Sequence, residues 1–279
     1  MELDQIASQF RSAWKQQYAY REPTIRCVTL ITDKPEEKSA GILRNVKRYL
    51  RILGDVEWRV LGKPDYQSVK TLLDNCLENP PDLIVTYRHL FYEEKGLHHS
   101  LGVYLDMLTQ ATDIPVLVLP HLNNKQYAEV LNNTSEVMVM TDHLAEDHRL
   151  VDFGVRLTAR EGTLFLAHVE SMSDYKRYLK VIGKIPELDT DIAENKIANQ
   201  LLKEPRDFIE SCRVQLADLP LTLSPLITFG HTVKTYRELI KKHRVDLLIL
   251  NTKDDEQLAM HGEAYSIAVE FTDVPLLLL

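Results

Sequence analysis

The clearest pattern in the sequence is a pair of short apolar runs, each of which directly follows an aspartate. Residues 83–85 follow Asp82, and residues 247–249 follow Asp246. A short apolar run without polar alternation is typical of a strand that is buried on both faces, as in a parallel sheet. We therefore predict one such strand after each aspartate.

The same sequence of features follows both runs. A glycine, Gly102 or Gly262, opens an amphipathic segment whose apolar residues recur at helical spacing. Thirteen residues after each glycine a proline, Pro115 or Pro275, introduces a second apolar run. Because proline at the first position of a strand removes no ladder donor, this placement is physically sensible. The repeated strand, loop, helix and strand predict two copies of one α/β module.

Hydrophobic periodicity extends this prediction along the chain. We expect helices at residues 3–18, 39–53, 65–77, 144–160, 192–216 and 233–243, and further strands at residues 25–32, 56–61, 137–140, 164–169 and 221–229. Residues 172–186 are expected to be irregular or weakly helical, and Pro205 is expected to break or kink the helix that contains it. The second half would then hold five parallel strands joined by crossovers.

The two modules are expected to differ in length. We assign residues 1–120 to a shortened first module, residues 136–279 to the second and residues 121–135 to a linker. Two alignments of the first module are open: either one β-α unit is missing after a first strand that ends at Thr32 and Asp33, or the first strand itself is missing. A matching Thr-Asp pair in the second module favours the former.

Charge and composition restrict the partners. The net charge of −8 disfavours nucleic acid or an anionic membrane as the main partner. The N-terminus lacks the basic and apolar regions of a signal peptide, and no apolar run is long enough to span a bilayer. Cys27, Cys76 and Cys212 lie far apart without metal-ligand spacing, which is typical of reduced, buried thiols in the cytoplasm. We therefore expect a cytoplasmic protein.

One set of features suggests a family. A first strand at residues 137–140 is followed by Thr-Asp, a second strand ends in His-Val at residues 168–169, and Gly230 follows the third. Together with the Asp246 strand and the segment from Gly262 to Pro275, this pattern resembles the universal stress protein family in its tandem form. The resemblance covers nearly all of residues 136–279, includes the last three strands within residues 56–119, and is poor before residue 56.

The resemblance implies a fold and a site. The fold would be Rossmann-like (adenine nucleotide alpha hydrolase-like), with parallel strands in the order 3-2-1-4-5 in each module. The modules would pair through their last strands, residues 116–119 against residues 276–279. In members that bind ATP, an aspartate after the first strand and the backbone of the second strand hold the nucleoside. Those positions are Asp142 and Val169 here, and the phosphate loop would span Asn251 to Gly262.

The phosphate loop departs from the family pattern. Its first two glycines fall on Asn251 and Asp254, and the serine expected after Gly262 is Glu263. Phosphates usually need backbone N–H groups at glycines together with positive potential. Three consecutive carboxylates at residues 254–256 face one lysine here, and the 10 glycines of the chain are about half of average usage. We therefore expect no cofactor, with ATP or AMP as the alternative.

The histidines add a second candidate site. His98 and His99, together with His89, follow a strand at the edge where α/β folds bind ligands. They lack the spacing of a helical zinc motif, so a surface loop is the favoured interpretation and we expect no metal. His143 and His148 are five residues apart, do not share a helix face, and are expected in solvent.

No pattern in the sequence indicates an enzyme. It contains no nucleophile elbow and no cysteine with an obvious histidine partner. Asp33 and Asp142 are either nucleoside ligands or residues near a helix N-terminus, where a carboxylate is favourable. We expect a non-enzymatic stress-response or regulatory protein that acts by binding an unidentified protein partner or a second copy of itself. The alternative is a sensor that binds an adenine nucleotide or nucleoside through its second module.

Overall fold

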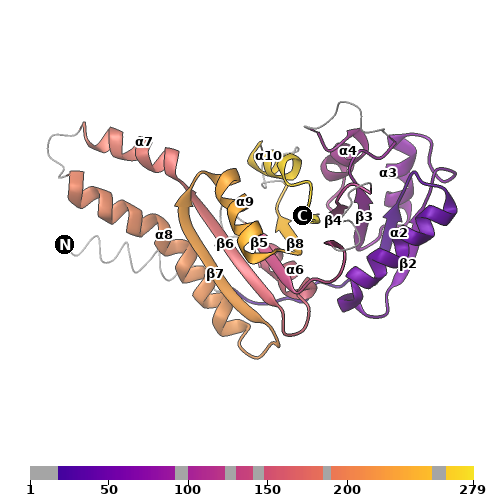
Figure 1. The fold of residues 1–279 in the computed structure, drawn as a ribbon, viewed down its shortest axis with the longest axis horizontal. Helices are drawn as coiled ribbons and strands as arrows, with labels where there is room; N and C mark the ends of the chain where they lie inside the picture. The colour runs from indigo at the N-terminus through magenta and orange to yellow at the C-terminus, as the bar shows by residue number, and fades with distance from the viewer. Residues whose placement is uncertain (1–17, 92–99, 123–129, 141–147, 185–189, 253–261) are drawn as a thin grey trace.

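The computed structural model of the chain describes residues 18–91, 100–122, 130–140, 148–184, 190–252 and 262–279 (Figure 1). The strands in these ranges are β1 (Cys27–Ile31), β2 (Glu57–Leu61), β3 (Leu83–Tyr87), β4 (Val116–Leu119), β5 (Glu136–Met140), β6 (Thr163–Ser171), β7 (Thr222–Gly230), β8 (Leu247–Leu250) and β9 (Leu276–Leu278). The helices are α2 (Glu36–Tyr49), the 3-10 helix η1 (Arg51–Leu53), α3 (Val69–Glu78), α4 (Val103–Ala111), α6 (His148–Leu157), α7 (Met172–Ile182), α8 (Thr190–Gln215), α9 (Thr232–His243) and α10 (Gly262–Glu270).

The described strands form one mixed sheet in the order β2-β1-β3-β4-β9-β8-β5-β6-β7. Its second half, from β7 to β9, has the predicted order 3-2-1-4-5 when its strands are numbered along the chain. In the first half β1 lies between β2 and β3, just as β5 lies between β6 and β8. This confirms that the strand before Asp33 is the first strand of its half and that one β-α unit is missing after it.

The two halves of the sheet meet at their last strands, as predicted. β4 and β9 pair antiparallel, with Leu117 opposite Leu277, and every other ladder in the described sheet is parallel. Both strands are buried along their whole length. The apolar runs without alternation therefore form strands at the centre of the sheet. Such strands are apolar at every position because both of their faces are covered.

The two repeated aspartates have a structural role that their pattern did not reveal. The Asp82 carboxylate accepts hydrogen bonds from the backbone N–H groups of Arg26 and Cys27, at 2.7 and 2.9 Å. The Asp246 carboxylate accepts one from the N–H of Glu136 at 2.9 Å. In each half the aspartate thus satisfies backbone donors at the start of the first strand, which would otherwise lack a ladder partner.

Several predicted helices differ from the observed ones. Residues 172–186 were expected to be irregular or weakly helical, but α7 is a regular helix whose N-cap, Ser171, accepts a hydrogen bond from the N–H of Asp174. α7 and the first half of α8 project from the end of the sheet (Figure 1). α8 continues through Pro205, so the predicted break does not occur and the predicted kink stays a prediction. α3 begins at residue 69 rather than 65, because Ser68 forms a capping box with Thr71.

The remaining structural predictions have mixed outcomes. Cys27, Cys76 and Cys212 are free and buried, as expected. The prediction that His148 is in solvent is wrong: its Nε2 is buried without a hydrogen-bond partner, and its ring packs against Tyr18 and Phe208.

In the described ranges no helix is long and apolar enough to cross a membrane. The predicted helix at 3–18 (up to residue 17), Asp142, His98, His99 and His143 lie outside the described residues.

Candidate functional site

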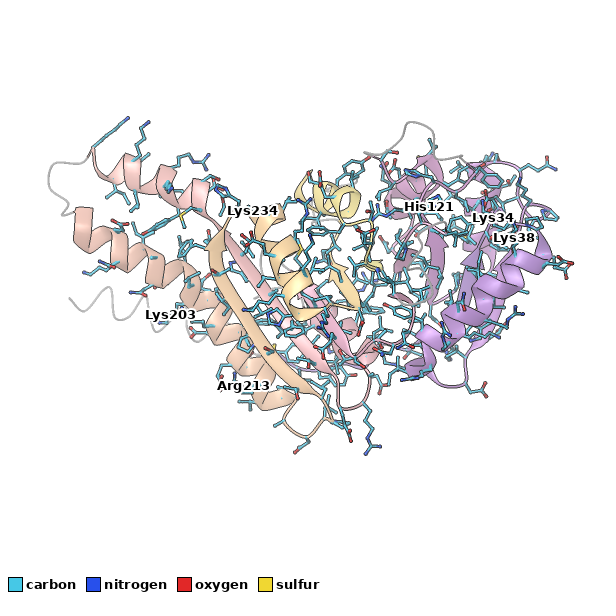
Figure 2. The ribbon with its side chains drawn as sticks, in the orientation of Figure 1. Lys34, Lys38, His121, Lys203, Arg213 and Lys234 are labelled. Carbon is cyan, nitrogen blue, oxygen red and sulfur yellow. The ribbon has the colours of Figure 1, made fainter. Side chains whose placement is uncertain are left out.

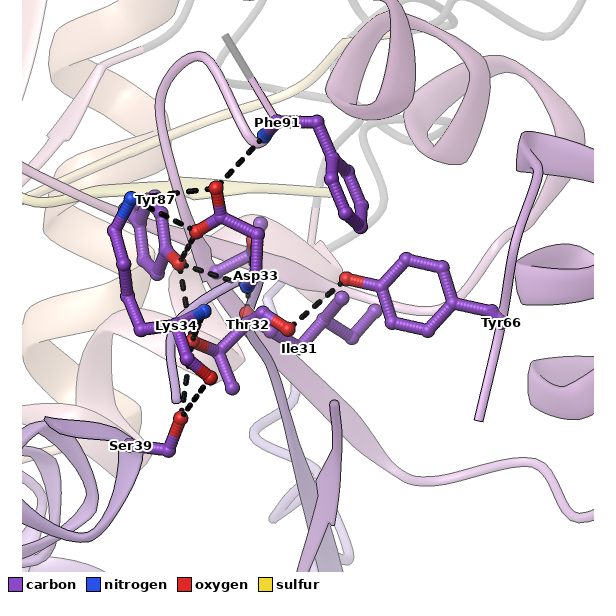
Figure 3. A network of polar contacts seen from close by, with 9 residues as sticks. Ile31, Thr32, Asp33, Lys34, Ser39, Tyr66, Tyr87 and Phe91 are labelled. Carbon is purple, nitrogen blue, oxygen red and sulfur yellow. Dashed lines mark hydrogen bonds and ion pairs between the residues drawn. The ribbon is translucent and has the colours of Figure 1, made fainter. Parts of the chain in front are cut away.

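The best-defined polar site lies at the carboxyl ends of β1 and β3, around Asp33. Asp33 follows β1 directly, and its side chain is only 9% exposed. Lys34 Nζ lies 3.1 Å from its Oδ1 and 3.2 Å from its Oδ2, and the N–H of Phe91 donates to Oδ2 at 3.2 Å. Both carboxylate oxygens are therefore bound by groups of the protein itself (Figure 3).

Tyr87, the last residue of β3, is the centre of this network. Its hydroxyl donates to Asp33 Oδ1 and accepts from the backbone N–H of Asp33 at 2.9 Å. It also lies 3.0 Å from Thr32 Oγ1. Figure 3 shows the phenol directed from β3 toward the loop after β1. The parallel pairing of β1 with β3 explains the contact, since it brings the carboxyl ends of both strands to one edge.

Electrostatics keep Asp33 ionised. Burial opposes the charged form, but hydrogen bonds from Tyr87 and Lys34 and the charge of Lys34 outweigh it, so the pKa of Asp33 is lowered from its ordinary value. Burial, followed by the hydrogen bond to Asp33, raises the pKa of Tyr87. The pair is therefore a carboxylate with a neutral phenol at neutral pH, which suits a structural contact.

Aromatic rings occupy the space beside this pair. The ring of Phe91 lies 5.4 Å from that of Tyr66 and 4.8 Å from that of Tyr104, between ring centres. Tyr66 donates its hydroxyl to the carbonyl of Thr32 at 3.1 Å. Phe91 takes a positive φ of 68°, a conformation that is unusual for a residue other than glycine. These rings thus pack together beside the Asp33–Tyr87 pair.

The Asp33 network should make the free energy of unfolding depend on pH in the acidic range. Because the folded-state pKa of Asp33 is lowered, its ionised form stabilises the fold above the unfolded pKa, and this contribution is lost as the pH falls through the folded pKa. We expect the difference in unfolding free energy between the wild type and Asp33→Asn to shrink from about pH 6 to about pH 3. Urea unfolding at each pH measures it. Asp55→Asn, at an exposed position, is the control, and a difference that stayed constant would contradict the role given to Asp33.

The second half brings its predicted site residues to one edge without completing a site. Met140, the last residue of β5, pairs with Ala167 on one side and Leu250 on the other. Val169 and Asn251 therefore lie just beyond the carboxyl end of β5, on its two neighbours. Gly262 begins α10. Asp142 and the loop at residues 253–261 lie outside the described residues, so the site assigned to Asp142, Val169, Asn251 and Gly262 stays a prediction.

Near these residues the described part of β6 reaches beyond the described part of β5, and the backbone after β8 is closed. β6 pairs with β7 as far as Ser171, but its ladder with β5 ends at Ala167, so residues 168–171 extend past β5. Beyond β8, Thr252 is buried, and its hydroxyl and N–H both donate to the carbonyl of Leu279, at 2.6 and 2.9 Å. The start of the predicted phosphate loop is thus held by hydrogen bonds to Leu279, the residue that follows β9.

Sequence reasoning missed the Asp33 network because its members are distant in sequence. Nothing in the sequence around Tyr87 indicates that it binds a residue 54 positions away. The signal that could have found it was the strand alignment, which brings the residues after β1 and β3 together. No group of three or more metal-ligating side chains occurs among the described residues.

Comparisons with known proteins concern the fold alone. No protein-family profile matches the chain, and no curated protein does. Similar solved structures include a functionally unknown protein from Pseudomonas aeruginosa PAO1 (12% identity, TM-score 0.49, 92% of this chain and 93% of that one). A putative universal stress protein from Pseudomonas aeruginosa UCBPP-PA14 is also similar (12%, 0.48, 92% and 94%). So is a universal stress protein from Archaeoglobus fulgidus DSM 4304 (15%, 0.44, 91% and 87%). At these identities and scores the similarity says nothing about activity or ligand.

Proposed function

We propose that this chain is a cytoplasmic, non-enzymatic stress-response or regulatory protein of the tandem universal stress protein type, which acts by binding a protein partner. It would consist of two modules, residues 1–120 and 136–279, joined by residues 121–135 and related as a pseudo-dimer. The first module would serve as a scaffold that holds no nucleotide. The observation that carries this proposal is the Asp33 carboxylate, whose two oxygens are bound by Tyr87, Lys34 and Phe91.

The hydrogen bonds of Asp33 and the aromatic rings beside it favour a scaffold role for the first half. A ligand hydroxyl would have to displace the hydrogen bonds that Asp33 already accepts, and each displaced bond costs about as much as the new one returns. The rings of Phe91, Tyr66 and Tyr104 stand where a ligand would enter. Opening that space would expose packed aromatic surface, at about 25 cal/mol per Å².

The alternative function is a sensor that holds an adenine nucleotide or nucleoside in the second half. It is favoured by the length of β6, whose residues 168–171 extend past Met140, the last described residue of β5. In that case Asp142 and the Val169 backbone would hold the nucleoside. The acidic loop at residues 254–256 still opposes a triphosphate, so adenosine or AMP fits this alternative better than ATP.

Thermal unfolding with added nucleotide distinguishes the two functions. A ligand at about 100 times its dissociation constant stabilises the folded state by roughly 2.7 kcal/mol, and for a chain of this size that raises the Tm by several degrees. We expect no shift with ATP, AMP or adenosine. A shift with adenosine or AMP that Asp142→Ala abolishes would establish the sensor instead. A shift with ATP that also disappeared in Asp33→Asn would show that the first half binds nucleotide and would overturn the proposal.

A further inference from the structure

The helices α7 and α9 are basic, although the chain as a whole has a net charge of −8. α7 has three lysines or arginines and one acidic residue, and α9 has four and one. A groove of about 460 Å³ joins the two helices, and Ser171 and Ser173 at the start of α7 and His231 and Lys234 at the start of α9 line it. Figure 2 labels Lys234 at this end of α9. The starts of the two helices thus border one groove.

Helical spacing groups the basic residues of α7 and those of α9. We call the following residues the basic strip: Arg177, Lys180, Lys184, Lys234, Arg237 and Lys241. All six are exposed. Arg177 and Lys180 are three residues apart in α7, and Lys184 lies two residues beyond its end. Lys234, Arg237 and Lys241 are three and then four residues apart in α9, the spacing that places side chains on one face of a helix. The strip is therefore built by helical periodicity on two segments that are about 50 residues apart in sequence.

Two carboxylates pair with members of the strip, and a third, Glu238, lies on the same face of α9, four residues after Lys234 and three before Lys241. Arg177 pairs with Asp174 at 3.1 Å, and Arg237 pairs with Glu270 at 2.5 Å. Lys180, Lys184 and Lys234 form no ion pair within the described part of the chain. Exposed like charges repel one another, so an anionic partner would relieve this repulsion as well as gain new contacts.

Exposed apolar groups beside the strip narrow the kind of partner. Tyr178 is 46% exposed and Val181 is 58% exposed, three residues apart on the projecting helix α7. The Arg177 guanidinium lies 5.8 Å from the centre of the Tyr178 ring. A surface that combines cations with an aromatic and an aliphatic side chain suits a peptide that carries both carboxylates and an apolar anchor.

We infer that the basic strip is the docking surface for an acidic protein segment with an apolar anchor. Nucleic acid and anionic membranes are less suited, because the net charge of −8 disfavours such extended polyanions as partners. A short acidic segment can lie on the strip alone. This inference rests on the proposed function only in taking the partner to be a protein.

The test is fluorescence anisotropy with the full chain and three probes at equal ionic strength. The probes are a labelled peptide of glutamates and leucines, a labelled oligothymidine, and phosphatidylserine-containing vesicles with a labelled lipid. We expect the peptide to bind in preference to the other two and to weaken as salt rises from about 50 to about 300 mM. The same peptide with glutamine in place of glutamate should not bind.

Two charge-reversal variants separate the strip from a general charge effect. Arg177→Glu, Lys180→Glu and Lys234→Glu together should weaken peptide binding by about tenfold or more. The matched control is Lys38→Glu, Lys203→Glu and Arg213→Glu, which changes the net charge equally at exposed sites on α2 and α8 (Figure 2). Circular dichroism checks that both variants fold.

Each outcome decides the inference. Equal loss in both variants, no binding of the acidic peptide, or preferential binding of the oligonucleotide or the vesicles would overturn it. Loss in the strip variant alone would support it. The assay contains no nucleotide, so its failure would leave the proposed function standing, whereas a nucleotide-dependent rise in Tm would overturn that function without affecting the strip.

Discussion

Replacing Leu277 by alanine should lower the free energy of unfolding by about 2–5 kcal/mol, the usual cost of a leucine-to-alanine change in a packed core. Leu277 is fully buried in β9, opposite Leu117 across the antiparallel junction and beside Ile249 in the parallel ladder with β8. The change leaves a cavity where the two halves of the sheet meet, and neighbours held on both sides can collapse into it only partly. Chemical unfolding monitored by circular dichroism measures the effect.

Leu77→Ala is the matched control for this substitution. Leu77 lies in α3 and is 58% exposed, so the same chemical change removes little buried surface. We expect it to change the unfolding free energy by less than about 0.5 kcal/mol. Similar losses in the two variants would mean that the junction of β4 and β9 is not part of the core.

Arg88→Ala should cost about 1.5–3 kcal/mol, the contribution of a hydrogen bond to a charged group, and more if the space is not refilled. Arg88 follows β3 and is 3% exposed, and its guanidinium donates to the carbonyl of Phe271 at 2.9 Å. That carbonyl follows the end of α10, where the helix dipole favours a cation. Burial lowers the pKa of Arg88 to about 10, and the charge of Asp273 opposes this shift.

The exposed residue Arg44 in α2 provides the control for Arg88. Arg44→Ala removes the same side chain from a solvated face and should be nearly neutral. Equal stability of the two variants would show that the Arg88 contact does not hold α10 to the first half. A loss for Arg88→Ala with unchanged stability of Arg44→Ala is the expected result.

The sequence predicted the sheet well because its main signals are local. An apolar run after an aspartate, a glycine that starts a helix and a proline that starts a strand each act within a few residues. Asp82 and Asp246 therefore located equivalent strands, and the glycine-to-proline spacing located α4 and α10. α7 was missed although its apolar residues Met172, Tyr175, Leu179 and Ile182 recur at helical spacing.

The site features depend on contacts between distant residues, which a single sequence does not display. The bond from Tyr87 to Asp33 requires the pairing of β1 with β3. The basic strip could not be predicted from the net charge, which is negative. Its residues come from two separate segments of an acidic chain. The loss of the two loop glycines, which fall on Asn251 and Asp254, is visible in the sequence alone because it concerns single positions of a short pattern.

Native mass spectrometry of protein purified without added nucleotide tests the central claim most directly. The claim is that this chain works as a binding scaffold whose first half is closed by the Asp33 network and which carries no nucleotide. We predict a mass equal to that of the chain alone, or of a whole number of copies. A mass increased by one adenine nucleotide per chain would contradict the claim and make nucleotide sensing the leading function.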